Sequence, residues 1–327
     1  MYLVTGGAGF IGSNLVAELA ARAERVVVCD WLRHDDRWRN LAKHEIADLI
    51  APESLSEWLG QKSRKLRAVL HMGAISATTE TDVDLIVRNN IRLSLDLLEW
   101  CRQSGTPFIY ASSAATYGNG DAGFDDEFSV EALARLRPLN AYGWSKHVVD
   151  RRVARLIDDG AAMPPQWVGL KFFNVYGPNE YHKGTMQSVV ARNFAAVSGG
   201  EPMRLFRSYR QQYPDGGQLR DFIYVRDCVE VILWLLEHPQ VCGLFNVGTG
   251  RARSWLDLAT ALLRACGRDQ AIEFTDMPAA LIDKYQYFTQ AHMERLHRAG
   301  YTRAFTTLED GVTEYVQRYL ATNDPYR

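Results

Sequence analysis

The sequence predicts an α/β protein in which a doubly wound parallel sheet is joined by a smaller second α/β domain. Two observations predict this class. Short apolar runs alternate with longer amphipathic stretches through the first half, and a glycine-rich turn joins the first run to the first stretch. Strands of a parallel sheet are covered by helices on both faces, so they are apolar throughout. The expected strands are 2–5, 25–30, 68–72, 107–112 and 167–173, and the expected helices are 11–21, 83–104 and 141–158.

The composition is that of a globular chain. Of 327 residues, 47% are hydrophobic and 23% charged, with a formal net charge of −2, which argues against disorder and against a basic nucleic-acid binder. The five cysteines are widely spaced without a CxxC pair, so we expect neither disulfides nor a metal site. The first residues do not resemble a signal peptide, and no apolar run approaches the roughly 18 residues of a membrane span. We expect a cytoplasmic protein without nucleic-acid or membrane partners.

The first expected strand runs directly into the glycine-rich turn TGGAGFIG. Gly6, Gly9 and Gly12 stand between this strand and the first helix. Glycines at this spacing permit a tight turn and close approach to a pyrophosphate, which the amino end of the helix attracts. Asp30 ends the second strand, where a carboxylate can bind a ribose hydroxyl. These features predict a Rossmann-type dinucleotide site.

The residues after Asp30 leave the dinucleotide open. A carboxylate at this place favours NAD. Arg33, Arg37 and Arg39 follow at once, and any of them could bind the 2′-phosphate of NADP. A solvated basic loop would account for them equally well.

A tyrosine and a lysine are spaced for one helix face. Tyr142 and Lys146 stand at positions i and i+4 of the expected helix 141–158, one turn apart. An ammonium group beside a phenol lowers the phenol pKa, which favours a base near neutral pH. Ser113, just beyond the fourth strand, can share the proton or bind the substrate oxygen. The order of glycine turn, serine and Tyr-x-x-x-Lys favours a catalytic tyrosine base over an inert helix surface.

The pattern loosens after residue 173. Glycine, proline and polar residues at 177–184, 198–202 and 208–218 predict loops, and the long segment 208–218 is expected to be a flap or a surface insertion. The remaining expected strands are 222–225 and 244–247, and the remaining expected helices are 226–237, 254–266 with Ser254 as its cap, and 307–320.

With these motifs the chain resembles the extended short-chain dehydrogenases/reductases, and among them the ADP-L-glycero-D-manno-heptose 6-epimerase family. The stretches that carry this resemblance are TGGAGFIGSN, YASSAATYG, NAYGWSK, FFNVYGPNEYHKGTM, RDFIYVRD, FNVGTGRA, KYQYFTQA and DGVTEYV. The most diagnostic is Lys183-Gly184-Thr185, because other sugar epimerases share NVYGP without this HKG.

The resemblance implies epimerisation at C6″ of ADP-D-glycero-β-D-manno-heptose through a transient 6″-ketone. It implies a tightly held NADP⁺, with NAD possible, and a place in lipopolysaccharide inner-core precursor synthesis. The two acid/base groups of the family fall on Tyr142 and Lys183. The family also implies a homo-oligomer, known as a homopentamer. The expected division is a dinucleotide-binding domain of residues 1–173 with about 220–248, and a substrate domain of about 174–219 with 249–327.

The resemblance assigns further residues by position. Those expected at the cofactor are Gly6, Gly9, Phe10, Ile11, Gly12, Asp30, Trp31, Arg37, Met72, Gly73, Ala74, Ile75, Ser76, Asn89, Lys146, Val175 and Lys183. Those expected at the substrate are Ser113, Asn174, Thr185, Arg192, Phe206, Arg207, Ser208, Arg220 and Tyr285. The catalytic group expected is Tyr142, Lys183, Lys146 and Ser113.

Three other functions fit the sequence less well. A UDP-hexose 4-epimerase is disfavoured by Lys183-Gly184-Thr185. A sugar 4,6-dehydratase would carry carboxylates after the fourth strand, where this chain has Ala114-Ala115-Thr116-Tyr117. A non-catalytic dinucleotide sensor on the same fold would typically lack the tyrosine or the lysine, and both are present.

Overall fold

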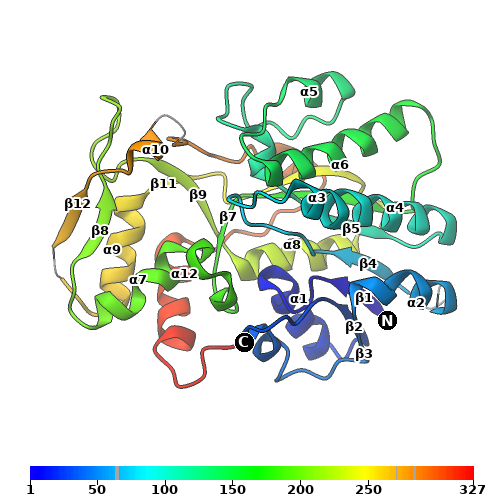
Figure 1. Ribbon diagram of the computed structural model, residues 1–327, viewed down its shortest axis with the longest axis horizontal. Coiled ribbons are helices and arrows are strands. Elements are labelled where there is room, and N and C mark those ends of the chain that lie inside the picture. Colours follow the sequence, from blue (N-terminus) through cyan, green and yellow to red (C-terminus); the bar gives the residue numbers. More distant parts are fainter. Residues whose placement is uncertain (63–65, 270, 283–284) are drawn as a thin grey trace.

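The centre of the fold is a seven-stranded parallel sheet with the strand order β10-β6-β5-β4-β1-β2-β3. The computed structural model, which describes residues 1–62, 66–269, 271–282 and 285–327, shows helices on both sides of this sheet (Figure 1). Its strands are β1 (Tyr2–Thr5), β2 (Val26–Cys29), β3 (Asp48–Ile50), β4 (Ala68–His71), β5 (Phe108–Ser113), β6 (Trp167–Phe172) and β10 (Gly243–Val247). The predicted doubly wound parallel sheet is confirmed.

The direction of strand addition reverses beside β1. The chain first adds β2 and β3 on one side of β1, then returns to add β4 on its other side. Thr5, the last residue of β1, therefore stands in register with Cys29 of β2 and His71 of β4. Ligands of doubly wound sheets bind beyond the carboxyl ends of the strands at such a reversal.

The helices follow the amphipathic stretches of the sequence. The α-helices are α1 (Phe10–Ala21), α2 (Leu55–Lys62), α3 (Val83–Ile86), α4 (Leu93–Ser104), α5 (Val130–Arg135), α6 (Ala141–Asp158), α7 (Val189–Ser198), α8 (Val225–Glu237), α9 (Trp255–Ala265), α10 (Ala279–Ile282), α11 (Glu294–Arg298) and α12 (Leu308–Tyr315). The short 3₁₀ and π segments are η1 (Asp36–Asn40), η2 (Pro52–Ser54), η4 (Val87–Arg92), η5 (Ala114–Tyr117), η6 (Tyr181–Met186) and η7 (Val316–Leu320).

Alternate residues of the strands face two separate apolar layers. One layer joins Leu3 and Val69 to α2, α4 and α6, and the other joins Val4 and Leu70 to α1 and α8. Each layer holds free cysteines: Cys29 and Cys101 are buried in the first, and Cys228 in the second. Figure 1 shows α4 and α6 on one side of the sheet and α1 and α8 on the other. This two-sided burial explains why the strands lack an alternating polar pattern.

A smaller part of the fold contains two short sheets. Their strands are β7 (Asn174–Tyr176), β9 (Leu219–Tyr224) and β11 (Ala252–Ser254) in one sheet, and β8 (Met203–Phe206) with β12 (Ile272–Thr275) in the other. They share an apolar cluster with α7, α9 and α12. Residues 222–224 of the expected strand 222–225 belong to β9, and Val225 begins α8. The loop expected at 208–218 contains no regular element.

Two long helices expected from the sequence are modified. Residues 83–104 form α3 and α4 with the π-helical segment η4 between them, and residues 307–320 end in the π-helical segment η7. The cap expected at Ser254 is present as a reciprocal capping box with Asp257. None of the described helices is long and apolar enough to cross a membrane.

Candidate active site

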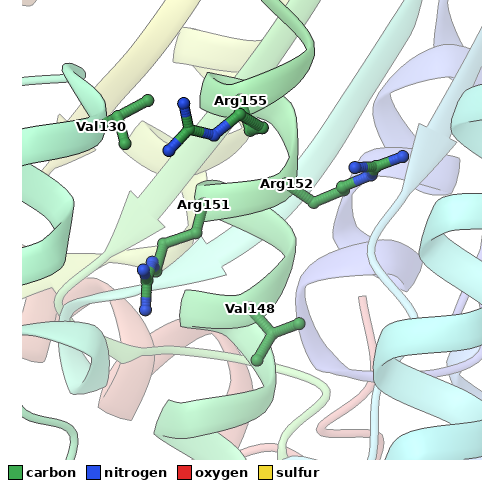
Figure 2. Close-up of a pocket in the computed structure, with 5 residues that line it drawn as sticks. All are labelled: Val130, Val148, Arg151, Arg152 and Arg155. Atoms are coloured by element: carbon green, nitrogen blue, oxygen red, sulfur yellow. The ribbon is translucent and has the colours of Figure 1, made fainter.

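A large cavity of about 800 Å³ opens beyond the carboxyl ends of β1, β4 and β5. Its wall combines the glycine turn, the loop after β4, the start of α6 and the segment around Lys183, closed by Trp255, Gln286 and Thr289 from the later part of the chain. A second hollow, of about 300 Å³, lies between α5 and α6 and is lined by Val130, Val148, Arg151, Arg152 and Arg155 (Figure 2). That second hollow contains none of the predicted site residues, so the large cavity is the candidate active site.

The glycine turn fits a dinucleotide pyrophosphate. A Cβ at Gly12 would lie 2.1 Å from the carbonyl oxygen of Gly6, and a Cβ at Gly6 would lie 2.5 Å from Gly73. The turn therefore brings helix α1 and the loop after β4 closer together than side chains would allow. Helix α1 begins after Gly9 with no side-chain cap and no acidic residue in its first turn. Its amide groups and its partial positive charge are thus left for an anionic group.

Asp30 stands at the end of β2 beside this turn. One of its carboxylate oxygens accepts from the Ala8 amide at 2.9 Å, and the other accepts from the Trp31 amide at 2.8 Å. Burial raises the pKa of Asp30, and these amides oppose the rise. The Trp31 indole itself turns away to Glu53. Asp30 lines the cavity where a ribose hydroxyl of a dinucleotide bound at the turn could be recognised.

Two of the three candidate arginines line the cavity. Arg33 and Arg37 are in its wall, whereas Arg39 packs over the ring of Tyr326 at 5.7 Å. Arg37 is held by Asp35 through two bonds of 2.8 and 2.7 Å. A 2′-phosphate would therefore meet Arg33 and Arg37.

The loop after β4 is fixed by a buried amide. The side chain of Asn90 accepts from the Ile75 amide at 2.8 Å and donates to the Ile75 carbonyl at 3.0 Å. It also donates to Ser145 of α6 at 3.0 Å. Its neighbour Asn89, the residue expected at the cofactor, donates instead to the carbonyl of Leu85 and is absent from the cavity wall. Asn90 lies inside the π-helical segment η4, which no local sequence pattern indicated.

The Tyr-x-x-x-Lys pair is positioned by the start of α6. Asn140 caps this helix by accepting from the Gly143 amide at 2.8 Å. A Cβ at Gly143 would lie 2.7 Å from the Ala115 carbonyl, so the missing side chain lets α6 approach the end of β5. Tyr142 is thereby placed within hydrogen-bonding reach of Ser113. Both line the cavity together with Lys146.

Burial acts on both ionisable groups of this pair. It raises the pKa of Tyr142, and the Ser113 hydrogen bond opposes the rise. It lowers the pKa of Lys146 to about 8, against the attraction of Asp150. The lowered phenol pKa that the sequence predicts is not found: the pKa of Tyr142 is raised, because burial removes the phenolate from water.

A buried ion pair supports α6 from behind. Lys171 of β6 and Asp150 of α6 are fully buried, 3.6 Å apart. Asp150 also accepts from Ser112 at 2.7 Å, while Lys171 donates to Thr116 at 2.8 Å. Thr116 in turn donates to the Ser113 carbonyl at 2.8 Å. The network therefore links the helix that carries Lys146 to the strand end that carries Ser113.

Lys183 lies on another wall of the cavity. It belongs to η6, which is kinked at Gly184 (φ +53°), and its ammonium lies 4.9 Å from the ring centre of Phe10. Burial lowers the pKa of Lys183, and the nearby Glu180 opposes this. Glu180 is itself buried and accepts from the Ser188 hydroxyl at 2.7 Å. A half-buried lysine beside the glycine turn, with its pKa lowered, can serve as a base.

The cavity brings together most of the residues predicted from the sequence. Those in its wall are Gly6, Gly9, Phe10, Ile11, Gly12, Asp30, Arg37, Met72, Gly73, Ala74, Ile75, Ser76, Ser113, Tyr142, Lys146, Asn174, Val175, Lys183, Thr185 and Arg192. Those outside its described wall are Trp31, Asn89, Phe206, Arg207, Ser208, Arg220 and Tyr285.

The outlying substrate residues form a group next to the cavity. Arg220 is buried between the rings of Trp255, at 5.8 Å, and Tyr285, at 5.4 Å. Trp255 lines the cavity, so Arg220 stands one ring behind the wall. Phe206 contacts Tyr285 edge to face. Arg207 is paired with Asp215 at 3.2 Å, and the Ser208 amide donates to the same Asp215.

Several residues of the wall were missed by sequence reasoning. Among them are His182, Trp255, Gln286 and Thr289. Burial lowers the pKa of His182 to about 4, so it is neutral near pH 7. His182 belongs to the HKG stretch and could have been found there. The other three come from segments whose place depends on distant contacts, and no local motif marks them.

Comparison with known proteins identifies the family of the chain. The model of the NAD dependent epimerase/dehydratase family matches residues 2–248. The chain belongs to this family. A curated Nitratidesulfovibrio vulgaris relative, named ADP-L-glycero-D-manno-heptose-6-epimerase, is 51% identical and covers 100% of both chains. A Fusobacterium nucleatum relative with the same name is 43% identical, again over 100% of both chains.

Solved structures of this family share the fold. The Helicobacter pylori ADP-L-glycero-D-manno-heptose-6-epimerase matches with a TM-score of 0.80 at 29% identity, over 97% of this chain and 95% of that one. The Thermus thermophilus UDP-glucose 4-epimerase, solved in complex with NAD, matches with a TM-score of 0.71 at 26% identity, over 95% and 96%. The resemblance stated from the motifs is therefore confirmed.

Proposed function

We propose that this protein is an isomerase that converts ADP-D-glycero-β-D-manno-heptose into ADP-L-glycero-β-D-manno-heptose by inverting C6″. The observation that carries the proposal is the placement of Tyr142 and Lys183 on different walls of one cavity that also holds the glycine turn. Inversion through a ketone requires acid/base help for both orientations of the sugar, and two walls can supply it. The full-length relatives named for this reaction support the choice of substrate.

The residues of the cavity fit a nicotinamide dinucleotide. The close approach of Gly6, Gly12 and Gly73, the uncapped start of α1 and the carboxylate of Asp30 match its pyrophosphate and ribose. Arg33, together with the guanidinium of Arg37 that Asp35 orients, can receive the 2′-phosphate of NADP, so we propose NADP as the resident form, with NAD as the alternative. When bound, the nicotinamide supplies reversible hydride exchange with the sugar carbon.

The side chains of the chain hold and move the protons. Tyr142, which burial keeps protonated, exchanges a proton with the C6″ oxygen in one orientation of the sugar. Ser113 forms hydrogen bonds with the Tyr142 phenol and with the C6″ oxygen. Lys146, one helical turn after Tyr142, orients the ribose of the nicotinamide. Lys183, whose pKa burial lowers, accepts the proton of the C6″ hydroxyl in the other orientation. Because Tyr142 then donates to the ketone oxygen, the proton held by Lys183 returns to Tyr142 through the solvent before the next turnover.

The nucleotide part of the substrate is assigned to the later segments. We propose that Asn174, Thr185 and Arg192 bind the sugar or its phosphates, and that Arg220, Phe206 and Tyr285 border the nucleotide. This assigns the dinucleotide to residues 1–173 with about 220–248, and the substrate to the remainder. We further propose a cytoplasmic homo-oligomer acting in lipopolysaccharide inner-core precursor synthesis, as in the family.

One experiment tests the reaction. The purified protein, without added cofactor, is incubated with ADP-D-glycero-β-D-manno-heptose, and the configuration at C6″ is followed by NMR. A mixture rich in the L-glycero epimer supports the substrate, the reaction and the retained dinucleotide together. Absence of conversion after addition of NADP⁺ and then NAD⁺ would overturn the substrate, and UDP-hexoses would be tried next. The dinucleotide released by denaturation identifies NADP or NAD by mass.

A further inference from the structure

Residues 324–327, here called the clasp, lie across three segments that build the cavity. The first is helix α1, which follows the glycine turn. The Arg327 guanidinium donates to Asn14 of this helix at 3.3 Å and forms an ion pair with Glu18. The Arg327 side chain is 17% exposed, so this ion pair is largely shielded from water. Figure 1 places this end of the chain beside α1.

The second segment is the one that leads into Lys183. The Arg327 amide donates to the side chain of Asn179 at 2.9 Å, and the Tyr181 hydroxyl donates to the Pro325 carbonyl at 2.8 Å. The rings of Tyr181 and Tyr326 meet edge to face at 5.3 Å. Asn179 is fully buried in a left-handed conformation (φ +71°), which a non-glycine residue adopts only when its surroundings hold it.

The third segment follows η1, which carries Arg37. Lys43 forms an ion pair with Asp324 at 2.9 Å and donates to the Tyr326 carbonyl at 2.5 Å. His44 is 3.2 Å from the carbonyl oxygen of Arg327. The clasp therefore contacts the segments that present the glycine turn, Lys183 and Arg37.

The three segments also bond one another beneath the clasp. Asn14 donates to the Pro178 carbonyl at 2.9 Å, and Asn179 donates to Ser13 at 3.0 Å. Asn40 donates to the carbonyls of Ala8, at 2.8 Å, and Asn179, at 3.2 Å. These bonds close the edge of the cavity between the glycine turn and the Lys183 segment. The clasp covers this closure from outside without lining the cavity.

We propose that the clasp is a positioning element, in which Arg327 holds the Lys183 segment against helix α1 and so retains the dinucleotide and fixes the Lys183 amine. The proposal rests on the proposed function for the role of Lys183 and for the choice of NADP; if denaturation of the purified protein releases NAD, NADH replaces NADPH in the release assay. A dinucleotide on the glycine turn leaves when the α1 and Lys183 segments separate. Arg327 bridges both segments, so its loss speeds release while the central sheet stays intact.

The test compares Arg327→Ala with Arg303→Ala. Arg303 is a matched control, because it is a half-exposed arginine paired with Glu230 at 2.5 Å, away from the cavity wall. Both variants are loaded with NADPH, and its release is followed by loss of fluorescence after dilution into a trap, well below the unfolding temperature. We expect Arg327→Ala to release the dinucleotide at least tenfold faster than wild type, and Arg303→Ala to match wild type.

A second readout separates positioning from general destabilisation. In the NMR assay Arg327→Ala should lower kcat with little change in KM, and Arg327→Lys, which keeps the charge toward Glu18, should recover part of both effects. A chain ending at Asn323 should reproduce Arg327→Ala if it folds; if it does not, Arg327→Ala decides alone. Release from Arg327→Ala within twofold of wild type would overturn the proposal. The release assay needs no turnover, so failure of the proposed substrate would leave its outcome readable.

Discussion

Burial shifts the pKa values of the two side chains that we propose as acid/base groups in opposite directions. It raises the pKa of the Tyr142 phenol and lowers the pKa of the Lys183 ammonium, so each shifts toward its uncharged form. An uncharged phenol can donate a proton, and an uncharged amine can accept one. The Tyr142 phenol therefore holds its proton more firmly, and the Lys183 ammonium releases its proton more easily, than either group would in water.

Removal of either group should abolish turnover. We expect Tyr142→Phe and Lys183→Met to lower the rate of C6″ inversion by roughly 10²- to 10⁴-fold each, because each removes a proton-transfer group. Both variants keep a side chain of similar size, so the fold and the bound dinucleotide should be retained. NMR rates with the dinucleotide content per chain make the comparison. Turnover of Lys183→Met near the wild-type rate would contradict two-sided proton transfer.

His71 should make stability depend on pH. It is fully buried between Thr5, at 2.6 Å, and Ser94, at 2.8 Å, and burial lowers its pKa to about 3. The unfolded chain takes up the proton near pH 6.5, so this contribution to stability is present above that pH and is lost as the pH falls toward 3. At pH 5 the contribution of His71 to the free energy of unfolding is about 2 kcal/mol smaller than at high pH.

Urea unfolding at pH 8 and pH 5 measures this effect. The free energy of unfolding should fall by about 2 kcal/mol less in His71→Asn than in wild type over this interval. The exposed His34→Asn serves as the control and should keep the wild-type difference. Equal pH dependence in wild type and His71→Asn would contradict the buried neutral imidazole.

At the scale of elements, the glycine turn shows how missing side chains set the distance between two elements. Gly12 allows α1 to begin against the Gly6 carbonyl, whereas a Cβ at Gly60 of α2 would have no atom within 4 Å. We expect Gly12→Ala to cost roughly 1–3 kcal/mol and to weaken dinucleotide binding, because the turn must open. Gly60→Ala should stabilise α2 by up to about 1 kcal/mol and leave binding unchanged.

Thermal unfolding and a dinucleotide titration of the two variants distinguish these outcomes. Loss of binding in Gly60→Ala as well, or unaltered binding in Gly12→Ala, would show that close packing at the turn does not set the site.

Six strands of the central sheet were predictable because their apolar runs are continuous, but its edge strand β3 and four strands of the smaller sheets were not. β3 has two exposed residues among its three, and none of β7, β8, β11 and β12 is buried along its whole length. Such elements are defined by partners far along the chain rather than by local pattern. The π-helical turn at η4 has the same origin, since Asn90 there bonds Ile75 and Ser145.

The candidate site likewise has features that the sequence could predict and features that it could not. Tyr142 and Lys146 were predictable because helical spacing alone places them on one face. The direction of the Tyr142 pKa was not, because it depends on burial by the whole fold. Trp255 and Gln286 join the wall through the packing of later segments, which no local spacing encodes.

At the scale of the whole molecule, each of the two apolar layers contains at least one buried cysteine, whose reaction with an alkylating reagent shows when that layer opens. Burial raises the pKa of Cys29 to about 12 and also raises the pKa of Cys101 and Cys228, so reactive thiolate is suppressed in both layers. Cys242 and Cys266 are only partly buried. An alkylating reagent should label these two first and the other three only as the core opens.

Mass spectrometry after timed alkylation reads each thiol separately. Cys29, Cys101 and Cys228 should react together, at the rate of global unfolding, if the sheet and both layers open as one unit. Labelling of Cys228 well before Cys101 would show that the layer of α1 and α8 opens by itself.

The residues that line the cavity are synthesised at different times on the ribosome. The glycine turn is synthesised at the start of the chain, and β10, the last strand of the central sheet, ends at Val247. Gln286 and Thr289 of the cavity wall follow some forty residues later. At typical elongation rates that interval lasts about two to eight seconds. During it, a nascent chain holds every strand of its central sheet while one side of the pocket is still missing. A dinucleotide can thus bind at the glycine turn before the part of the cavity that will enclose the sugar has been synthesised.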